Sequence, residues 1–206
     1  MDLLTPAEIV RRADRLKADR TTTDTHWQEV ADYIMPSREF QASSTPGSKR
    51  MAKIYHTGPV MAAENLAGAL HGMLTSPSLR WFALRPDSDG LGRNQDVRIW
   101  FDLVTDAMYR IFTSPMVRFD LHMHENYLDQ AGFGTSVLFM PDRGQSGPGF
   151  QALPLSECFY SENDAGNIDT LYRCFSMRAS DVVARWDGGV TDDLRREASN
   201  KPDEKW

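Results

Sequence analysis

Two histidines, His122 and His124, are the closest pair of potential metal ligands in the sequence. Imidazole nitrogens bind zinc and related ions, and the neighbouring Asp120 and Glu125 carry carboxylates that could complete such a site. The surrounding residues have helical periodicity, however, and side chains two positions apart on a helix point about 200° apart. Both imidazoles cannot reach one ion on an intact helix, so the sequence favours a solvated helix face here.

The only cysteines are Cys158 and Cys174, which lie at similar distances in sequence from a turn predicted at residues 164–167. Strands joined by that turn could bring the two sulfurs close enough for a disulfide. In a reducing cytoplasm two buried thiols are favoured over a disulfide. Neither cysteine has a histidine beside it in sequence, so nucleophilic catalysis has no local support.

Four carboxylates fall in the predicted hairpins and could in principle bind a metal or perform acid–base chemistry. They are Asp142, Glu162, Asp164 and Asp169. The chemistry of a tight turn explains them better, because Asp and Asn side chains accept hydrogen bonds from nearby backbone and Gly166 permits a positive φ. The regular spacing of a calcium loop and a phosphate-binding Gly-x-x-x-x-Gly-Lys motif are both absent from the sequence. We therefore expect no catalytic residues, no cofactor, no metal and no enzymatic activity.

The composition is that of a protein with a sizeable core. The chain has 206 residues, of which 41% are hydrophobic and 10% aromatic. Its net charge of −6, from 29 acidic and 23 basic residues, opposes tight binding to a phosphate backbone. No apolar run is long enough to span a bilayer, and the N-terminus lacks the core of a signal peptide. These features predict a soluble, cytoplasmic chain.

The stretch from Ile54 to Pro86 predicts a helix near 58–75 followed by a strand at 81–84. The helix has caps at its start, Pro59 in its first turn and Ser76-Pro77 at its end. An apolar stripe is expected to face a core; its members are Ala63, Leu66, Ala67, Leu70, Met73 and Leu74. The opposite side carries Glu64, Asn65, Gly68, His71, Gly72 and Thr75. Each interior glycine there costs about 1 kcal/mol relative to alanine, which indicates that something approaches that side closely.

The remaining elements follow from the same signals. A capping box at residues 5–8 begins a helix, a polar joint lies in 17–25, and a second helix ends at Pro36. Residues 37–53 predict an exposed loop, the best candidate for local disorder. A further helix is indicated by a strong apolar stripe that comprises Val97, Trp100, Phe101, Val104, Met108, Ile111 and Phe112. This stripe is expected to be buried, so that Trp100→Ala would lower the free energy of unfolding by about 3–5 kcal/mol.

A change of period at residue 135 separates helices from strands. A further helix covers 119–131, strands at 136–140 and 150–153 flank a glycine-rich turn, and strands at 158–161 and 168–177 flank the turn at 163–167. Short helices follow at 180–186 and 192–198. The sequence thus predicts an α+β fold, with amphipathic helices before a small antiparallel sheet. The expected segments are 1–36, 37–53, 54–134, 135–178 and 179–206.

Four stretches in order resemble the podovirus (T7-type) head-to-tail connector, or portal protein, family. The longest is Thr57–Leu84, in which TG is followed by ENLAGALHGMLTSPSLRWFAL. The others are WQEVADYIMP at Trp27–Pro36, GFGTSVLF at Gly132–Phe139 and GNIDTLYRCFSM at Gly166–Met177. Each motif alone could be capping and packing chemistry, whereas their common order makes the chain similar to the N-terminal part of this family.

This resemblance implies a structural subunit of a homo-oligomeric ring of about twelve copies, through which DNA is packaged and ejected without sequence-specific binding. The implied partners are the terminase, capsid, scaffolding and tail adaptor proteins. The implied location is the portal vertex of the virion, and the host cytoplasm during assembly; no membrane is involved.

The matched part resembles the peripheral wing of the family, and its end at Trp206 indicates a fragment, a truncated reading frame or a prophage remnant. On this reading we expect the isolated chain to be monomeric or heterogeneously associated and not to bind duplex DNA at physiological salt. The alternative is a small cytoplasmic binding or enzymatic domain whose site assembles from dispersed residues; a cleft lined by convergent ionisable groups would favour it.

Overall fold

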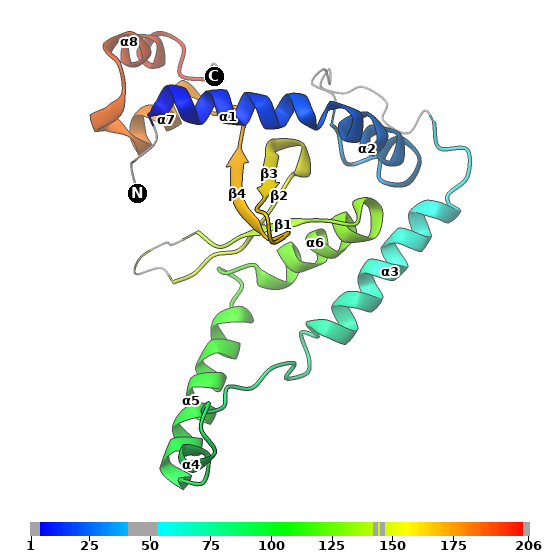
Figure 1. Cartoon of the computed structure of the whole chain (residues 1–206), viewed down its shortest axis with the longest axis vertical. Coiled ribbons are helices and arrows are strands. Elements are labelled where there is room, and N and C mark those ends of the chain that lie inside the picture. The colour runs from blue at the N-terminus through cyan, green and yellow to red at the C-terminus, as the bar shows by residue number, and fades with distance from the viewer. Residues whose placement is uncertain (1–4, 41–52, 142–143, 145–146, 204–206) are drawn as a thin grey trace. The chain divides into compact units, whose positions relative to one another are not determined.

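The computed structural model describes residues 5–40, 53–141, 144 and 147–203 (Figure 1). The chain forms two compact units: unit 1 comprises Met1–Ala13 and Phe159–Trp206, and unit 2 comprises Asp14–Cys158. The α-helices are α1 Pro6–Asp19, α2 Thr21–Ile34, α3 Gly58–Leu74, α4 Asp89–Gly92, α5 Gln95–Phe112, α6 Phe119–Phe133, α7 Ala179–Arg185 and α8 Asp192–Asn200. The strands are β1 Val137–Phe139, β2 Gln151–Leu153, β3 Cys158–Glu162 and β4 Ile168–Arg173. The α+β fold class is therefore confirmed.

The two N-terminal helices begin and end where local chemistry predicts. The backbone N–H of Thr5 donates to Oε2 of Glu8 at 2.9 Å, and the Glu8 N–H donates back to Oγ1 of Thr5 at 3.4 Å, which completes the capping box. These bonds lower the pKa of Glu8. The predicted joint is confirmed as the single residue Arg20 between α1 and α2. Of the predicted loop at 37–53, residues 41–52 lie outside the described part of the chain.

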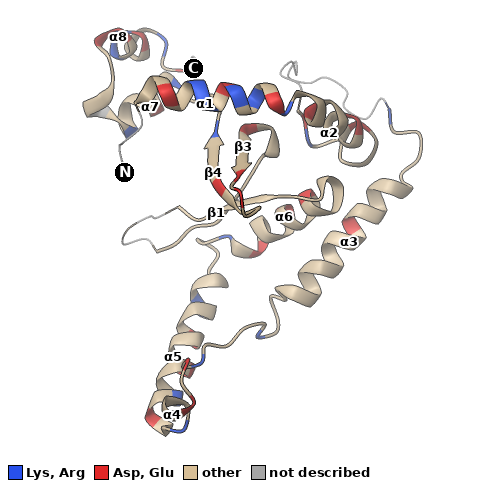
Figure 2. Cartoon of the chain, viewed as in Figure 1, with Lys and Arg blue, Asp and Glu red and all other residues tan. Residues whose placement is uncertain are grey.

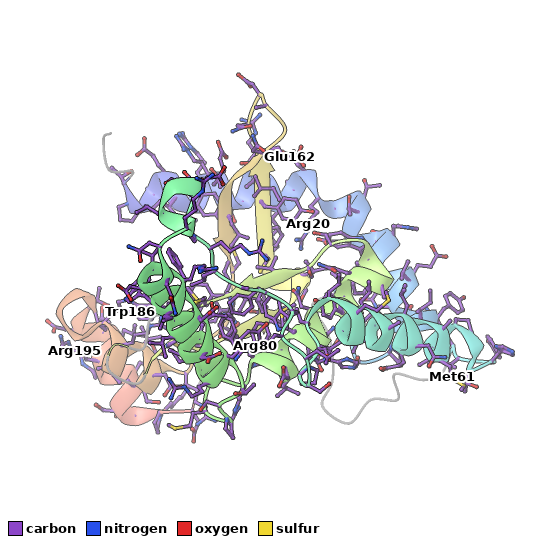
Figure 3. All side chains as sticks on the ribbon, turned by 90° about the horizontal axis from the view of Figure 1, so that it is seen from below. Arg20, Met61, Arg80, Glu162, Trp186 and Arg195 are labelled. Atoms are coloured by element: carbon purple, nitrogen blue, oxygen red, sulfur yellow. The ribbon has the colours of Figure 1, made fainter. Side chains whose placement is uncertain are left out.

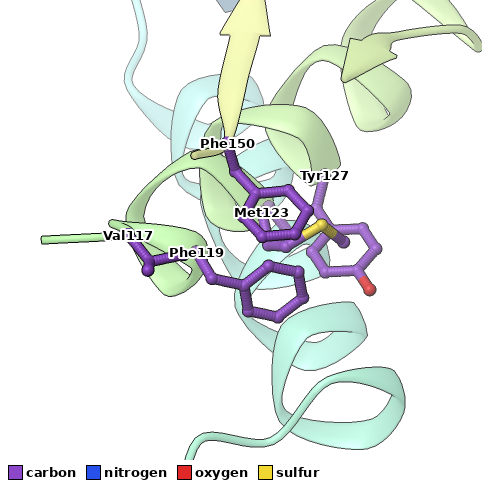
Figure 4. Packing of buried hydrophobic residues seen from close by; sticks show 6 residues of the cluster. Val117, Phe119, Met123, Tyr127 and Phe150 are labelled. Carbon is purple, nitrogen blue, oxygen red and sulfur yellow. The ribbon is translucent and has the colours of Figure 1, made fainter. Parts of the chain in front are cut away.

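The core of unit 2 lies where α3, α6 and the β1–β2 hairpin meet (Figure 4). Its buried members are Ala67, Val117, Phe119, Met123, Tyr127 and Phe150. The α2 helix also packs on α6, where Sδ of Met35 lies so close to Gly132 that a Cβ there would be 2.1 Å away. A side chain at position 132 would therefore require the Met35 side chain to move. The C-terminus of α6 is closed by Gly134 with φ 76°, a conformation that favours glycine.

The predicted helix at 58–75 is confirmed, but its buried face was only partly predicted. Ala63 and Ala67 are buried as expected, whereas Leu66, Met73 and Leu74 of the same stripe are 50–74% exposed. Thr75, assigned to the opposite side, is buried because its hydroxyl lies 3.2 Å from the Tyr127 hydroxyl. The stripe is wider than the contact with α6, so its outer part has no partner among the described residues.

The strand expected at 81–84 is wrong, because the described residues 80–86 form no ladder with any strand. Side chains of α5 satisfy this backbone instead. The N–H of Phe82 donates to the Tyr109 hydroxyl at 2.7 Å, and the N–H of Leu84 donates to Oγ1 of Thr105 at 3.1 Å. The segment is consequently held as an extended chain along the helix, with no neighbouring strand to pair with.

The helix expected from the stripe Val97–Phe112 is confirmed as α5, but the expected burial of the whole stripe is wrong. Trp100 is 58% and Ile111 40% exposed, and only Thr105 of this helix is buried. Val97, Phe101, Val104, Met108 and Phe112 are half-buried. The physical reason is that residues 80–86 and the aromatic core cover only one side of α5. A cost of 3–5 kcal/mol for Trp100→Ala therefore does not fit this structure.

Both predicted hairpins are present, as two separate two-stranded sheets. β1 and β2 are antiparallel, with Val137 opposite Leu153 and Phe139 opposite Gln151. β3 and β4 pair across the turn at 163–167, in which Gly166 has φ 76°. Of the first hairpin's turn, residues 142–143 and 145–146 lie outside the described part of the chain. The short helices α7 and α8 pack on each other. Among the described residues, no helix is both long and apolar enough to cross a membrane.

Candidate assembly surfaces

A stack of aromatic rings fixes α5 and the 80–86 segment on the core of unit 2. The Trp81 ring is nearly parallel to the rings of Phe112 and Phe119, with centroids 6.1 and 5.9 Å away. Phe119 also contacts Phe112 and Phe150, each at 4.9 Å between centroids. Offset stacks and edge-on pairs of this kind each add about 0.5–1.5 kcal/mol beyond the burial of their area. The stack therefore holds the inner side of α5 rigidly and sets the direction of its outer side.

A buried ion pair joins the segment after α2 to α6. Nε of Arg38 lies 2.6 Å from Oδ1 of Asp129, and its Nη2 lies 2.5 Å from Oε2 of Glu125. The Asp129 side chain is only 3% exposed. Burial raises the pKa of Asp129, an effect that the Arg38 guanidinium opposes. Such a pair fixes geometry more than it adds stability, because both charges lose their hydration.

The α3–α6 contact also brings together two histidines that lie far apart in the sequence. His71 of α3 and His124 of α6 have ring centroids 5.9 Å apart. Nε2 of His124 lies 3.7 Å from Oε2 of Glu64, and Nε2 of His71 lies 3.9 Å from Oδ1 of Asp120. The pairing was missed because His71 was assigned to the side of α3 away from the core. Within the described ranges, no three His, Cys, Asp or Glu side chains are grouped closely enough to hold a metal.

The other candidate residues are placed as follows. Cys158 is a buried free thiol, but Cys174 is exposed, so the expectation of two buried thiols is wrong for Cys174. Cys174 follows the end of β4, where no described helix or strand covers it. Glu162, Asp164 and Asp169 are exposed on the β3–β4 hairpin, whose turn is held by Asn163, while Asp142 lies outside the described residues.

A cleft of about 680 Å³ lies between α5 and residues 83–93. Its charged lining consists of three arginines and two aspartates, all exposed: Arg85, Arg93, Arg98, Asp89 and Asp102. The lining includes no histidine, cysteine or serine–base pair, although Ser88 contributes a hydroxyl. The cleft therefore offers an arrangement of charges and no recognisable nucleophile activated by a base.

Two exposed apolar surfaces of unit 2 are the other feature that requires an explanation. The α5 outer face consists of Ile99, Trp100, Leu103 and Ile111, which are 40–61% exposed. The α3 outer face consists of Met61, Leu66 and Met73, together with the small exposed residues Ala62, Gly68, Ala69 and Gly72. Exposed apolar surface gathered in this way is typical of sites of protein–protein contact.

Comparison with known proteins identifies the family of the chain. The sequence profile of the family described as bacteriophage head to tail connecting protein matches residues 7–206. The chain belongs to this family. The match covers both compact units, so unit 1 and unit 2 are parts of one connector sequence.

Two curated relatives agree with the family. The portal protein of Salmonella phage epsilon15 is 26% identical over 178 residues, and the probable portal protein of Bordetella phage BPP-1 is 28% identical over 178 residues. Each alignment covers 85% of this connector-family chain and 32% of the relative. The chain thus spans about a third of the length of the curated relatives it matches.

Proposed function

We propose that the chain is a structural subunit of a bacteriophage portal, the head-to-tail connector through which DNA enters and leaves the head. The observation that carries this proposal is the family match over residues 7–206, supported by two relatives whose names are portal protein and probable portal protein. The role is structural and not enzymatic. The exposed α3 and α5 outer faces support it, because a subunit of an assembly has apolar surface to cover.

The portal role implies a closed homo-oligomeric ring of about twelve subunits at one vertex of the virion, assembled in the host cytoplasm. Its partners are the terminase, capsid, scaffolding and tail adaptor proteins, and DNA passes through it without sequence-specific contacts. The net charge of −6 suits a conduit that must not hold DNA, since phosphate binding requires a cationic surface. No small-molecule cofactor takes part in this role.

The test is the location of the protein in phage particles. An affinity tag placed in the gene, followed by gold labelling and electron microscopy of opened heads, is expected to show label at a single vertex where head and tail meet. Quantitative mass spectrometry of the same particles is expected to give a copy number equal to that of a single ring. Absence of the chain from purified particles, or label at many vertices, would overturn the proposal.

A further inference from the structure

Residues 80–86 form an extended segment that is held on α5 by one of its two backbone edges. The N–H of Phe82 donates to the Tyr109 hydroxyl at 2.7 Å, and this hydroxyl donates to the Phe82 carbonyl at 3.2 Å. The N–H of Leu84 donates to Oγ1 of Thr105 at 3.1 Å. Backbone groups of residues two positions apart point to the same side of an extended chain. Phe82 and Leu84 therefore face α5 in the way that a strand faces its neighbour in a sheet.

The opposite backbone edge of this segment is open. It consists of the N–H and C=O groups of Trp81, Ala83 and Arg85, and none of these groups forms a hydrogen bond with a described residue. All three residues are exposed, so water solvates the edge in the isolated chain. A row of unpaired backbone groups on an extended segment is a template for a strand of another chain. The strand propensity at 81–84 therefore has a structural use that the described part of the chain does not supply.

The two ends of the open edge differ in charge. Arg80, labelled in Figure 3, begins the segment and forms an ion pair with Asp106 of α5. Arg85 is at the other end and lines the cleft beside α5, and within the described ranges it forms no ion pair. Acidic residues are interspersed with the arginines around α4 (Figure 2), and Asp89 and Asp102 line the same cleft. A strand with a single carboxylate suits this mixture better than a polyanion such as DNA, which the aspartates repel.

Among the described strands, β4 has the features that complement this edge. It is six residues long and pairs with β3 on one side, and no described strand lies on its other side. Ile168 and Leu171 of β4 are 58% and 44% exposed, and Asp169 between them is exposed and forms no ion pair with a described residue. β1 and β2 contain no Asp or Glu, and Glu162 is the last residue of β3, beside the turn (Figure 3). Of the described strands, β4 alone therefore has a carboxylate in its interior.

We propose that β4 of one subunit pairs with the open edge of residues 81–85 in a second copy of this chain, with Asp169 placed against Arg85. The pairing satisfies an open edge on each side, and opposite charges on adjacent strands add a favourable contact. The two surfaces differ, so the contact is heterologous, and heterologous contacts build rings when the rotation closes. The inference rests on the proposed portal function and names the surfaces through which its subunits would meet.

The expected contact is small. One strand added to a short edge buries far less than the roughly 1,200–2,000 Å² of a standard protein interface. Such a contact is weak by itself, so the isolated chain should associate only transiently. The pairing must therefore be trapped to be observed.

Covalent trapping with single cysteines tests the pairing. Ala83→Cys and Leu171→Cys are made separately in a Cys174→Ser background, which leaves only the buried Cys158. The two variants are mixed and treated with a short bismaleimide, so that every mixed product joins two copies of the chain. The matched control replaces Leu171→Cys by Phe139→Cys on β1, because Phe139 is 46% and Leu171 44% exposed. Roughly tenfold more mixed dimer is expected than in the control, the ratio that a contact worth about 1.4 kcal/mol produces.

Charge reversal tests the placement of Asp169 against Arg85. Arg85→Asp in the Ala83→Cys chain, or Asp169→Arg in the Leu171→Cys chain, should each lower the mixed yield about threefold or more. The two reversals together should restore most of the yield. Both positions are exposed, so the melting temperature of each variant should match that of its parent, which separates loss of the contact from loss of the fold.

Hydrogen exchange of backbone amides tests the strand pairing itself. In the monomer the Phe82 and Leu84 amides should exchange slowly and the Trp81 and Arg85 amides fast, because only the first two donate hydrogen bonds within the described part of the chain. In the purified cross-linked dimer, exchange of the Trp81 and Arg85 amides should slow by roughly tenfold or more. Exchange of the Phe82 amide should stay as it is in the monomer.

Four results would overturn the inference. A mixed yield no higher than the control would show that β4 does not meet this edge. Stronger dimer formation by Ala83→Cys alone would show that two copies of residues 80–86 pair with each other. Unchanged exchange of the Trp81 and Arg85 amides in the dimer would show a contact without strand pairing. A doubly reversed pair that cross-links no better than the single reversals would refute the placement of Asp169 against Arg85.

The portal function is judged separately from this contact. A chain that cross-links as expected but is absent from phage particles would refute the function and leave the contact standing. A chain found at the vertex whose positions 83 and 171 do not cross-link above the control would refute the contact and leave the function standing.

Discussion

Replacing Phe119 by alanine should remove the centre of the aromatic stack in unit 2. Phe119 is only 5% exposed, and its ring contacts Trp81, Phe112 and Phe150 at centroid distances of 4.9–5.9 Å. Truncating a buried phenylalanine costs about 3–5 kcal/mol, and the lost ring pairs place this site at the upper end of that range. A loss of this size is a large part of the stability of a domain.

Trp100→Ala is the matched control, because it removes a larger aromatic side chain that is 58% exposed. Its cost should be below about 1 kcal/mol, as for surface substitutions. The measurement is urea unfolding followed by far-UV circular dichroism, with the midpoint and the slope m fitted for each variant. Equal midpoints for the two variants, or a larger loss for Trp100→Ala, would show that the α5 outer face is buried and that the reasoning about this helix is wrong.

Three further predictions concern polar groups. Arg38→Met should destabilise unit 2 by roughly 2–4 kcal/mol in the same urea assay, because Asp129 then stays buried without its partner, and adding Asp129→Asn should recover part of the loss. Burial raises the pKa of Asp129 above its ordinary 3.8, so the folded state keeps this proton to higher pH. The contribution of Asp129 to the free energy of unfolding should therefore fall as pH rises from 3.8 through the raised pKa. Asp129→Asn should remove this part of the dependence of the unfolding free energy on pH. An unchanged pH dependence in that variant would contradict the assignment to Asp129. Tyr109→Phe should cost about 1–2 kcal/mol and speed hydrogen exchange of the Phe82 amide, and exchange as slow as in the parent chain would refute the role of this hydroxyl.

Local chemistry was the part of the fold that could be predicted from the sequence. The capping box at Thr5 and Glu8, and the joint within residues 17–25 that the structure places at Arg20, each depend on a short stretch of the chain. Such signals depend on a few neighbouring residues and need no knowledge of the tertiary structure. The change from helices to hairpins after residue 134 is also confirmed, because it too is indicated by a local change of hydrophobic period.

Burial was harder to predict, because a stripe shows that a helix is amphipathic and not what covers it. Trp100 and Leu66 have the spacing of core residues, yet each lies on a side that no described element of the chain covers. Residues 81–84 have strand propensity, but the backbone N–H groups of Phe82 and Leu84 donate to side chains of α5. The contact of Arg38 with Asp129 joins residues 91 positions apart, and no local pattern indicates such a pairing.

The chain order of the two units has a consequence for biosynthesis. Unit 1 is built from the first 13 residues together with Phe159–Trp206, while unit 2 is the continuous stretch between them. A ribosome therefore completes all of unit 2 before the second half of unit 1 has emerged. Unit 2 can fold on the nascent chain, whereas the N-terminal segment must wait until Phe159–Trp206 has been synthesised. Slow translation after residue 158 should consequently prolong the time for which that segment is open to chaperones and proteases.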